Sequence, residues 1–265
     1  MTAFAITGIG VIGPGFACWD DCAQVLRGER PYEPAAAAIA APPILSPRER
    51  RRASPTVRLA LGAARQAAEQ AGQRAGDLPA VFGSCHGEGK VTHNLLNALT
   101  SPDPVLSPTQ FHNSVHNTAA GYWAIAHSSQ APCDSVSGGD YSFAAALLIA
   151  AAQVVCERRA VLVVAYDAAL PEPMNAKRPM TGAFGAAMVL DQRGAEGAVC
   201  EVQCVPAAPG AEWATVSNSA LNTLAAENPS ARSLAMLEPI SRGERRAVVL
   251  GCAPGAFHEW TVTPC

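Results

Sequence analysis

The chain has 265 residues, of which 49% are hydrophobic and 15% charged, and its formal net charge is −3. This length suits one large α/β domain or two small ones, and the apolar fraction is high enough to bury a sizeable core. The weak negative charge excludes a basic field that would attract nucleic acid or anionic lipid. We therefore expect a globular protein whose partners bind a nearly neutral surface.

The nine cysteines lack the regular spacing of a disulfide framework, and a chain of this length and apolarity does not need cross-links. We expect them to be reduced. Residues 143–156 are the longest apolar run, but they fall short of the ~18 residues of a membrane-spanning helix. No cationic start followed by an apolar run opens the chain. These features predict a cytoplasmic protein without a membrane span.

Hydrophobic periodicity and turn residues predict alternating strands and helices in the first half of the chain. In chain order these are a strand at 3–7, a glycine-rich turn at 8–15, a helix at 19–27, a proline-marked loop at 31–47, a helix at 56–71, a strand at 78–82 and a helix at 91–99. After a further loop at 102–108, Asn117 is placed to cap a helix of small residues.

The second half continues the alternation. The patterns predict a strand at 132–137, a tight turn at SGGD, a helix at 141–156 and strands at 160–166, 186–190, 198–205 and 247–251. Residues 160–166 are uniformly apolar, which is typical of a strand buried on both faces of a sheet. Residues 206–243 are weakly patterned. The order of elements predicts a layered α/β fold whose sheet is covered on both faces.

Gly8, Gly10 and Gly13 satisfy the GxGxxG pattern after a strand, which in other proteins places a dinucleotide pyrophosphate at a helix start. Here Pro14 and Gly15 interrupt the place where that helix should begin. No second apolar strand ending in Asp or Glu follows after the expected ~20 residues. A structural glycine turn is the better interpretation, and we expect no cofactor.

Cys85 stands in the glycine-rich segment Gly83-Ser84-Cys85-His86-Gly87, directly after a predicted strand. Such a turn can lift a nucleophile above a sheet, so an acyl hydrolase or amidotransferase that uses Cys85 is an alternative hypothesis. That chemistry needs a base oriented by a third group, and the six histidines show no recognisable order for it. A packed thiol in a structural turn is the other interpretation.

His112 and His116 are four residues apart, so on one helix they would share a face and could hold zinc. The glutamate of the HExxH motif is absent, because Asn113 fills its place. Cys200 and Cys204 have the same spacing on a predicted strand, where they only point the same way. We therefore expect no metal site and interpret the histidines as neutral, hydrogen-bonded loop residues.

Several segments, in this order, resemble the N-terminal half of the β-ketoacyl synthases of the thiolase-like superfamily. AITGIGVIGPG is similar to the family's opening strand and turn, RRRASPTVRLALGAARQAAEQAG to its second helix, and FGSCHGEG stands at a glycine-rich turn. Asn117, Ala120 and Gly121 match the family's Asn-x-x-Ala-Gly helix, and Pro132 opens the next strand. The resemblance covers roughly residues 3–205. It implies a thiolase-like α/β fold, with a mixed sheet and helices on both faces.

In this family the nucleophilic cysteine stands at the start of the helix that follows this strand, where the helix N-terminus lowers its pKa. Counted in an ungapped register from Pro132 and back from Val161, that position is Asp140. The family's Gly-Glu-Gly-Ala-Gly motif becomes Gly182-Ala183-Phe184-Gly185-Ala186, and most of the second thiolase half, which carries two catalytic histidines, is missing. A carboxylate cannot form the thioester, so the resemblance implies no condensing activity. We expect Asp140 to cap the helix through Ser142 or Phe143.

SPTQFHNSVHNTAAGYWAIA, SGGDYSFAAALL and VVAYDAALPEP are most similar to short, chain-length-factor-like ketosynthase subunits of aryl polyene biosynthesis. This implies a single domain, 1–265, with a divergent C-terminal segment at 206–265. It also implies a heterodimer with a full-length catalytic ketosynthase, with acyl carrier protein as a second partner through that enzyme. Docking of carrier protein on the basic run Arg50 to Arg52 is an alternative to a solvated segment. A homodimer that binds an acyl chain or a carrier protein without catalysis is the other alternative.

The resemblance also implies which residues meet the partner. The strand from Cys133 to Ser137 pairs with its counterpart across a two-fold axis in the family. The loop ahead of the Asn-x-x-Ala-Gly helix reaches toward the partner's acyl pocket. The residues implied at the substrate tunnel or interface are Phe111, His112, Ser114, His116, Cys133, Ser137 and Asp140. The alternative for Phe111 is packing beneath its own loop, because large aromatics are usually core residues.

Overall fold

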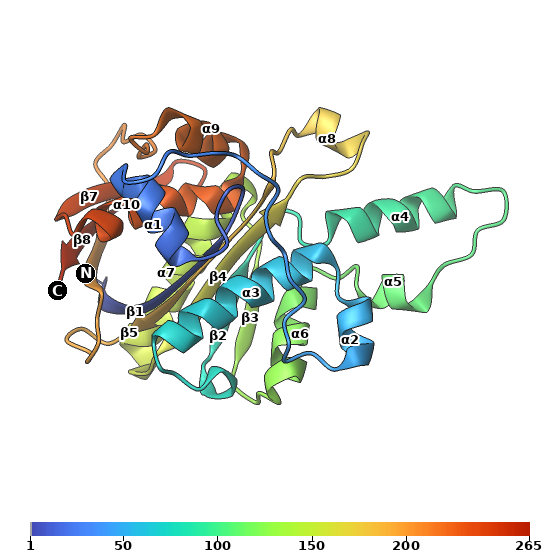
Figure 1. Cartoon of the computed structure of the whole chain (residues 1–265), viewed down its shortest axis with the longest axis horizontal. Helices are drawn as coiled ribbons and strands as arrows, with labels where there is room; N and C mark the ends of the chain where they lie inside the picture. Colours follow the sequence, from blue (N-terminus) through green and yellow to red (C-terminus); the bar gives the residue numbers. More distant parts are fainter. Residues whose placement is uncertain (1) are drawn as a thin grey trace.

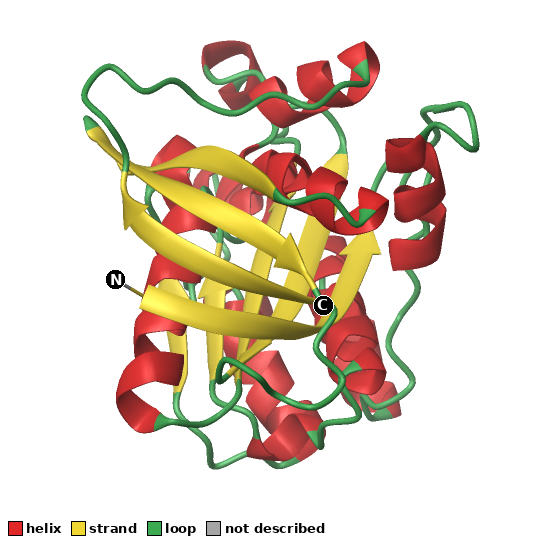
Figure 2. Cartoon of the chain, turned by 90° about the vertical axis from the view of Figure 1, so that its left-hand side faces the viewer, coloured by secondary structure: helices red, strands yellow, loops and turns green. Residues whose placement is uncertain are grey.

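A computed structural model describes residues 2–265 as one twisted mixed sheet between two layers of helices (Figures 1 and 2). The strands are β1 (Thr2–Ile12), β2 (Ala80–Gly83), β3 (Cys133–Val136), β4 (Val161–Ala168), β5 (Ala183–Asp191), β6 (Cys200–Pro206), β7 (Arg246–Ala253) and β8 (Ala256–Pro264). Their order across the sheet is β3-β2-β4-β5-β1-β6-β8-β7. β2 pairs in parallel with β3 and β4, and the other pairings are antiparallel. The predicted mixed α/β architecture is confirmed.

Helices cover both faces of this sheet. They are α1 (Trp19–Arg27), α2 (Pro47–Arg52), α3 (Pro55–Gln70), α4 (Gly89–Leu99), α5 (Pro108–His112), α6 (Thr118–His127), α7 (Ser142–Glu157), α8 (Met174–Lys177), α9 (Ser219–Glu227) and α10 (Leu234–Arg242). α3 and α6 bury one face with a core that includes Leu59 and Trp123. α7, α1 and α10 bury the other face, with Phe143 and Leu237 in its core.

The glycines of the GxGxxG pattern lie within a strand, so the expectation that the strand ends at Thr7 was wrong. Gly8 and Gly10 belong to β1, and α3 crosses the strand so closely that a Cβ at Gly10 would lie 2.1 Å from the carbonyl oxygen of Ala63. Gln70 and Gln66 of α3 accept hydrogen bonds from the backbone N–H groups of Ile9 and Val11. These glycines therefore permit helix-to-strand packing, as a structural role requires.

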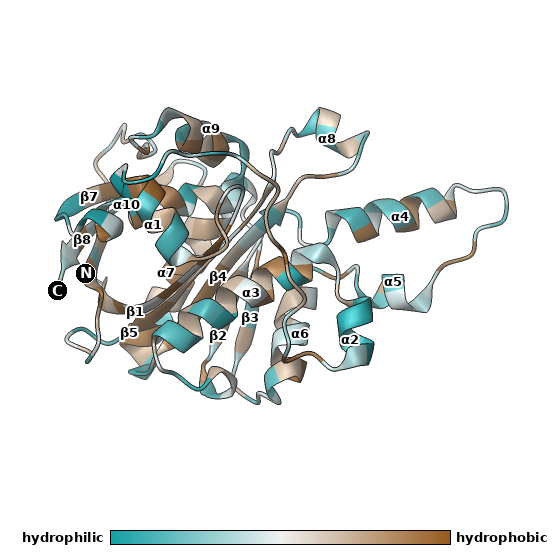
Figure 3. Cartoon of the chain, viewed as in Figure 1, coloured by the Kyte–Doolittle hydropathy of each residue, from teal (hydrophilic) through white to brown (hydrophobic). Residues whose placement is uncertain are grey.

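α7 is the most apolar helix of the chain, and by length and composition alone the segment Gly139–Glu157 could cross a membrane. In the structure its side chains Phe143, Leu147 and Val154 are buried against the sheet, where α7 contacts β4 and β2. Figure 3 colours the ribbon by hydropathy, and the central strands β1 and β5 are largely brown, the colour of apolar residues. The interpretation as a core helix agrees with this packing.

The C-terminal segment extends the sheet that the first 205 residues begin. β6 pairs with β1 on one side and with β8 on the other, and β8 pairs with β7. The strand predicted at 247–251 is confirmed as β7, whereas α9, α10 and β8 were not predicted. Glu238 of α10 is fully buried and forms ion pairs with the partly exposed Arg242 and Arg246, so one charged residue of this segment lies in the interior.

Candidate functional site

The start of α7 is the place at which the resemblance puts a nucleophile. β3 ends at Val136, and a turn follows in which Gly139 has a φ of +60°, a conformation that favours glycine. Asp140 lies in this turn, separated from the start of α7 at Ser142 by Tyr141. Its carboxylate forms an ion pair with Arg178, and both terminal nitrogens of the guanidinium donate to it. Among the described residues 2–265, no side chain caps α7, so the expectation that Asp140 caps this helix was wrong.

Arg178 lies just after α8, in the connection between β4 and β5, and this connection lies over the start of α7. Arg178 contacts His86 as well as Asp140. The Nε atom of Arg178 lies 3.1 Å from Nε2 of the His86 ring. Burial lowers the pKa of His86, and the positive charge of Arg178 lowers it further. A neutral imidazole can accept the hydrogen bond from Arg178, so the ion pair extends into the turn after β2.

Cys85 is half-buried beneath this cluster. Burial and the nearby Asp167 carboxylate raise the pKa of its thiol to about 11, so the thiol is protonated at neutral pH. Its neighbours are carboxylates and a guanidinium, and its own backbone N–H donates to Asp167 Oδ1 at 2.8 Å. In residues 2–265, the hydrogen bonds of His86 and His116 go to other groups, so neither imidazole acts as a base for Cys85.

Asp167, at the end of β4, is 1% exposed and is the central acceptor beneath the site. Ser84 Oγ donates to one carboxylate oxygen at 3.0 Å, and Ser230 Oγ donates to the other at 2.6 Å. Burial raises the pKa of Asp167 to about 6, although these hydrogen bonds oppose the shift. The carboxyl group thus joins the turn after β2 to the C-terminal segment.

β3 is an edge strand in the described sheet, because β2 is its one neighbour. Cys133 is half-buried with its sulfur 4.0 Å from the carbonyl of Ala120, and Ser137 Oγ donates to the carbonyl of Cys85 at 3.2 Å. His116 is turned inward, where its ring nitrogens contact Ser135 Oγ and the carbonyl of Ser84 at 2.9 and 3.0 Å. Within residues 2–265, no second strand pairs with the outer side of β3.

Apolar side chains are exposed on both sides of the β3 edge. Ile125 of α6 is 56% exposed, and Ile149 and Val155 of α7 are 37% and 47% exposed. Both helices are apolar around their circumference, a pattern typical of buried helices. A Cβ added at Gly121 of α6 would meet no atom within 4 Å. We call the surface formed by β3 with the outer sides of α6 and α7 the edge face.

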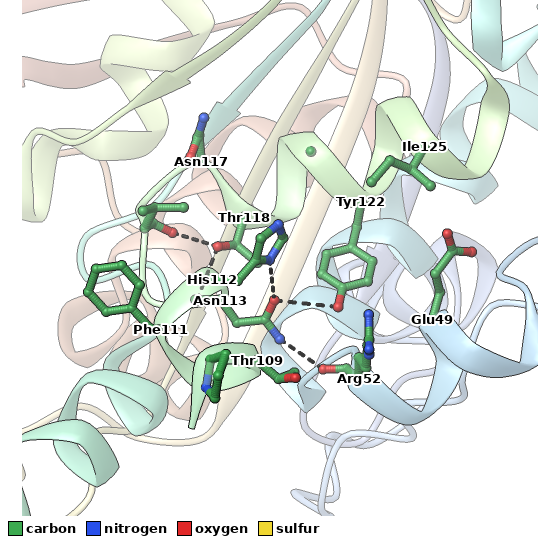
Figure 4. A pocket seen from close by; sticks show the side chains of 13 residues that line it. Glu49, Arg52, Thr109, Phe111, His112, Asn113, Asn117, Thr118, Tyr122 and Ile125 are labelled. Carbon is green, nitrogen blue, oxygen red and sulfur yellow. Dashed lines mark hydrogen bonds between the residues drawn. The ribbon is translucent and has the colours of Figure 1, made fainter. Parts of the chain in front are cut away.

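A pocket of about 860 Å³ adjoins the edge face between α2, α5 and α6 (Figure 4). Its walls include Phe111, Val115 and Ile125, and its polar groups include the Tyr122 hydroxyl and Asn113. The residues that line it are Glu49, Arg52, Pro108, Thr109, Phe111, His112, Asn113, Val115, Asn117, Thr118, Gly121, Tyr122 and Ile125. Although many of these residues are polar, most of the surface that they expose to the pocket is apolar, and the pocket is open to solvent.

The structure separates the residues that the sequence grouped in this loop. Phe111 and His112 line the pocket, and Phe111 is 66% exposed, so packing beneath its own loop was the wrong interpretation. Ser114 instead donates to the carbonyl of Phe111, and His116 is turned toward β3. α5 ends at His112, so the two histidines do not share a helix as a zinc site would need. In residues 2–265, no three His, Cys, Asp or Glu side chains gather as metal ligands.

Three residues of the site were not found from the sequence: Arg178, Trp213 and Arg232. The guanidinium carbon of Arg232 lies 4.1 Å from the centre of the Trp213 ring, and Trp213 stacks on Tyr141 with the ring centres 5.5 Å apart. Burial lowers the pKa of Arg232, and the negative charge of Asp140 opposes this shift. All three lie in loops or weakly patterned segments, where spacing gives no signal.

Several solved structures share this fold along nearly the whole chain. A ketosynthase in complex with its chain length factor from Xenorhabdus doucetiae (ApeO and ApeC) matches with 24% identity and a TM-score of 0.73, covering 98% of this chain and 99% of that chain. The ishigamide ketosynthase/chain length factor matches with 17% identity and a TM-score of 0.70, covering 100% and 99%. AntDE:AntF, a type II polyketide synthase acyl-carrier protein in complex with its ketosynthase, matches with 12% identity and a TM-score of 0.71, covering 100% and 99%.

No curated protein matches the sequence. The family model for the β-ketoacyl synthase N-terminal domain matches residues 19–261, which is most of the chain and includes β2, the edge strand β3, Asp140 and much of the C-terminal segment. The expected resemblance is thereby confirmed on the sequence as well as on the fold. The chain belongs to the β-ketoacyl synthase N-terminal domain family.

Proposed function

We propose that this chain is a non-catalytic, chain-length-factor-like subunit. It would pair with an active β-ketoacyl-ACP synthase during chain elongation of the aryl polyene, polyketide or fatty-acid type, in the cytoplasm. The observation that carries the proposal is the ion pair between Asp140 and Arg178 at the place of the family's nucleophile. A paired carboxylate at this place supplies neither a thiolate nor a leaving group for thioester exchange.

The surroundings of Asp140 support the loss of catalysis. Condensation also needs donors that stabilise the enolate formed when the extender unit loses CO₂, and the family's condensing enzymes use two histidines. Within residues 2–265, His86 is the one histidine that contacts Arg178, and the hydrogen bonds of His116 go to β3 and Ser84. The thiol of Cys85 is protonated, which disfavours the alternative of a cysteine hydrolase or amidotransferase.

The edge face supports a partner of the same fold. An unpaired edge strand flanked by exposed apolar side chains is a liability that association removes. We propose that β3 pairs with the corresponding strand of a catalytic ketosynthase, so that Cys133 and Ser137 lie at the interface. Two of the similar solved structures each contain a ketosynthase with its chain length factor, which fits a heterodimer. Acyl carrier protein would then reach the complex through the catalytic subunit.

The pocket beside the edge face suggests how this chain would influence product length. Phe111 and Val115 are both large, apolar and more than half exposed. We propose that Phe111, with His112 beside it, faces the growing acyl chain held by the partner and limits it by steric bulk. Ser114 and His116 would instead hold the loop, since their hydrogen bonds are made within this chain.

Native mass spectrometry tests the proposal, with the protein measured alone and after co-expression with a ketosynthase encoded beside it. A 1:1 heterodimer is the expected species. A homodimer that persists in the presence of the ketosynthase would favour an independent acyl-binding or carrier-binding protein instead. The variant Ile125→Asp, with Leu99→Asp of α4 as the matched exposed control, locates the interface. Ile125→Asp should abolish the heterodimer if the edge face forms it.

A further inference from the structure

One charged side chain stands on the strand at the centre of the edge face. Asp134 is the second residue of β3 and is exposed, whereas the other three residues of the strand are half-buried. Cys133 and Ser135 are turned toward α6 and the loop that precedes it, as their side-chain contacts show. Because side chains alternate along a strand, Asp134 and Val136 lie on the α7 side of the sheet, and Val136 packs against the core on that side.

The chain supplies this carboxylate with no cation. Asp134 Oδ2 accepts a hydrogen bond from Gln153 Nε2 of α7 at 2.8 Å, and within residues 2–265 Asp134 forms no ion pair. The Oε1 atom of the same amide is buried without a hydrogen-bond partner, which costs free energy. Ile149, one turn before Gln153 on α7, is an exposed apolar neighbour. Water stabilises the charge of Asp134 in the separate chain, and burial against a partner would leave it without a counter-ion.

Two copies of β3 cannot pair with one another without bringing two such carboxylates together. Residues directly opposite in an antiparallel pair point to the same face of the sheet. A symmetric pair centred on this strand therefore places Asp134 opposite its own copy or opposite the second copy's Val136. The Cβ atoms of the two aspartates would be about 5 Å apart in the first register and about 7 Å apart in the second. Like charges at these positions destabilise a sheet, and the cost grows when the closing interface removes water.

We propose that Asp134 prevents β3 from pairing with a second copy of this chain and fits the edge face to a partner strand that presents Lys or Arg on the α7 side. A cation there would lie where the second aspartate repels, and it would donate to the carboxylate. The partner would thus be selected by a repulsive element as well as by an attractive one. The identity of that partner, a catalytic ketosynthase, rests on the proposed function, whereas the exclusion of self-pairing depends on this chain alone.

The first test uses this chain alone, as wild type, Asp134→Asn and Asp134→Lys. Sedimentation velocity over a range of concentrations gives the dissociation constant of each homodimer. The lysine variant carries a nitrogen-isotope label, so that native mass spectrometry separates mixed dimers from matched ones. Glu244→Lys is the matched control, because it reverses the charge of an exposed residue beside β7, the strand at the opposite edge of the sheet. The melting temperature of each protein verifies its fold.

We expect Asp134→Asn to self-associate at least about tenfold more tightly than wild type, because its dimer brings no like charges together. An equimolar mixture of wild type and Asp134→Lys should form mixed dimers at concentrations where each protein alone is monomeric, since a lysine then faces an aspartate. Wild type mixed with Glu244→Lys should stay monomeric. Equal dissociation constants for Asp134→Asn and wild type, or mixed dimers no more abundant than matched ones, would overturn the proposal. If Asp134→Lys does not fold, the comparison of Asp134→Asn with wild type decides.

The second test adds the ketosynthase encoded beside this chain. Asp134→Lys should weaken the heterodimer at least about tenfold, because two cations then oppose one another, and Glu244→Lys should leave it unchanged. Equal binding of wild type and Asp134→Lys would overturn the inference but leave the proposed heterodimer standing. Mixed dimers in the first test, without any binding of the ketosynthase in the second, would support the exclusion of self-pairing by Asp134 and contradict the proposed function.

Discussion

Ser230 donates a hydrogen bond to the buried carboxylate of Asp167 at 2.6 Å, and this contact ties the C-terminal segment to the end of β4. The other carboxylate oxygen accepts from Ser84 Oγ and from the backbone N–H of Cys85. One titratable side chain thereby joins three segments that are distant in the sequence. The ionisation of Asp167 should therefore make the stability of the folded protein depend on pH.

The first prediction concerns that pH dependence. Burial raises the pKa of Asp167 from 3.8 to about 6, so the folded state favours the neutral carboxyl group. A group with a raised pKa contributes stability that is complete below its unfolded pKa and is lost as the pH rises through the folded value. The contribution of Asp167 to the free energy of unfolding should therefore fall by about 2 kcal/mol between pH 4 and pH 7.

Urea unfolding of wild type and Asp167→Asn across this pH range measures that contribution. The difference in stability between the two proteins should change with pH in the stated direction, because asparagine does not titrate. Ser230→Ala, which removes one donor and keeps the carboxyl group, is the matched control and should retain the pH dependence. A difference that stays constant, or that grows in favour of wild type as the pH rises, would contradict the assignment.

The second prediction concerns the strength of the Asp140–Arg178 pair. Its side chains are 44% and 36% exposed, so solvent screens the interaction strongly. Asp140→Ala and Arg178→Ala should each cost less than about 1 kcal/mol, and a double-mutant cycle should give a coupling of about 0.5 kcal/mol. Thermal unfolding of the four proteins measures it. Additive effects of the two substitutions would show that the pair contributes no coupling.

The third prediction concerns the crossing of α3 over β1. Gly10→Ala would place a Cβ 2.1 Å from the carbonyl oxygen of Ala63, a backbone atom that moves only if the helix shifts. This substitution should cost about 3 kcal/mol of unfolding free energy. Gly121→Ala is the control in the isolated chain, because its Cβ meets nothing within 4 Å and alanine stabilises a helix interior by about 1 kcal/mol. Equal stabilities of these two variants would contradict the packing described for β1.

The predictability of the fold differed between segments for physical reasons. α7, β4 and α1 were predicted within one or two residues of their ends, because long apolar runs and clear turn residues define them. β8 was missed, since Trp260 and Val262 are its fully buried side chains and two alternating positions give a short signal. α10 was missed because Pro239 and the buried Glu238 resemble loop residues in the sequence.

The candidate site was predictable only where it lies within a continuous segment. Asp140 follows from its distance along the chain from Pro132, so its position could be read from the sequence. Its partner Arg178 is 38 residues away in an irregular connection, and such a contact depends on tertiary packing that no local pattern records. For the same reason the sequence predicted that Asp140 caps the helix, whereas in the structure the carboxylate of Asp140 pairs with the guanidinium group of Arg178.

The fourth prediction concerns Phe111. Phe111→Ala should lengthen or broaden the products of the assembled complex and leave assembly intact, because the aromatic ring is exposed and supplies bulk at the pocket mouth. Product analysis by mass spectrometry measures the length distribution. Leu96→Ala of α4, an exposed apolar residue outside the pocket, is the matched control. An unchanged distribution from a folded, heterodimeric Phe111→Ala variant would remove Phe111 from the tunnel.

The central claim is that the chemistry belongs to the partner. The direct measurement is carbon–carbon bond formation from acyl and malonyl carrier-protein thioesters, using this chain alone, the heterodimer, and heterodimers carrying Asp140→Ala or a serine in place of the partner's nucleophilic cysteine. The account predicts product only from the heterodimers with an intact partner cysteine, and Asp140→Cys in the isolated chain should give none. Condensation by this chain alone, or by a heterodimer whose partner lacks its nucleophile, would contradict the account.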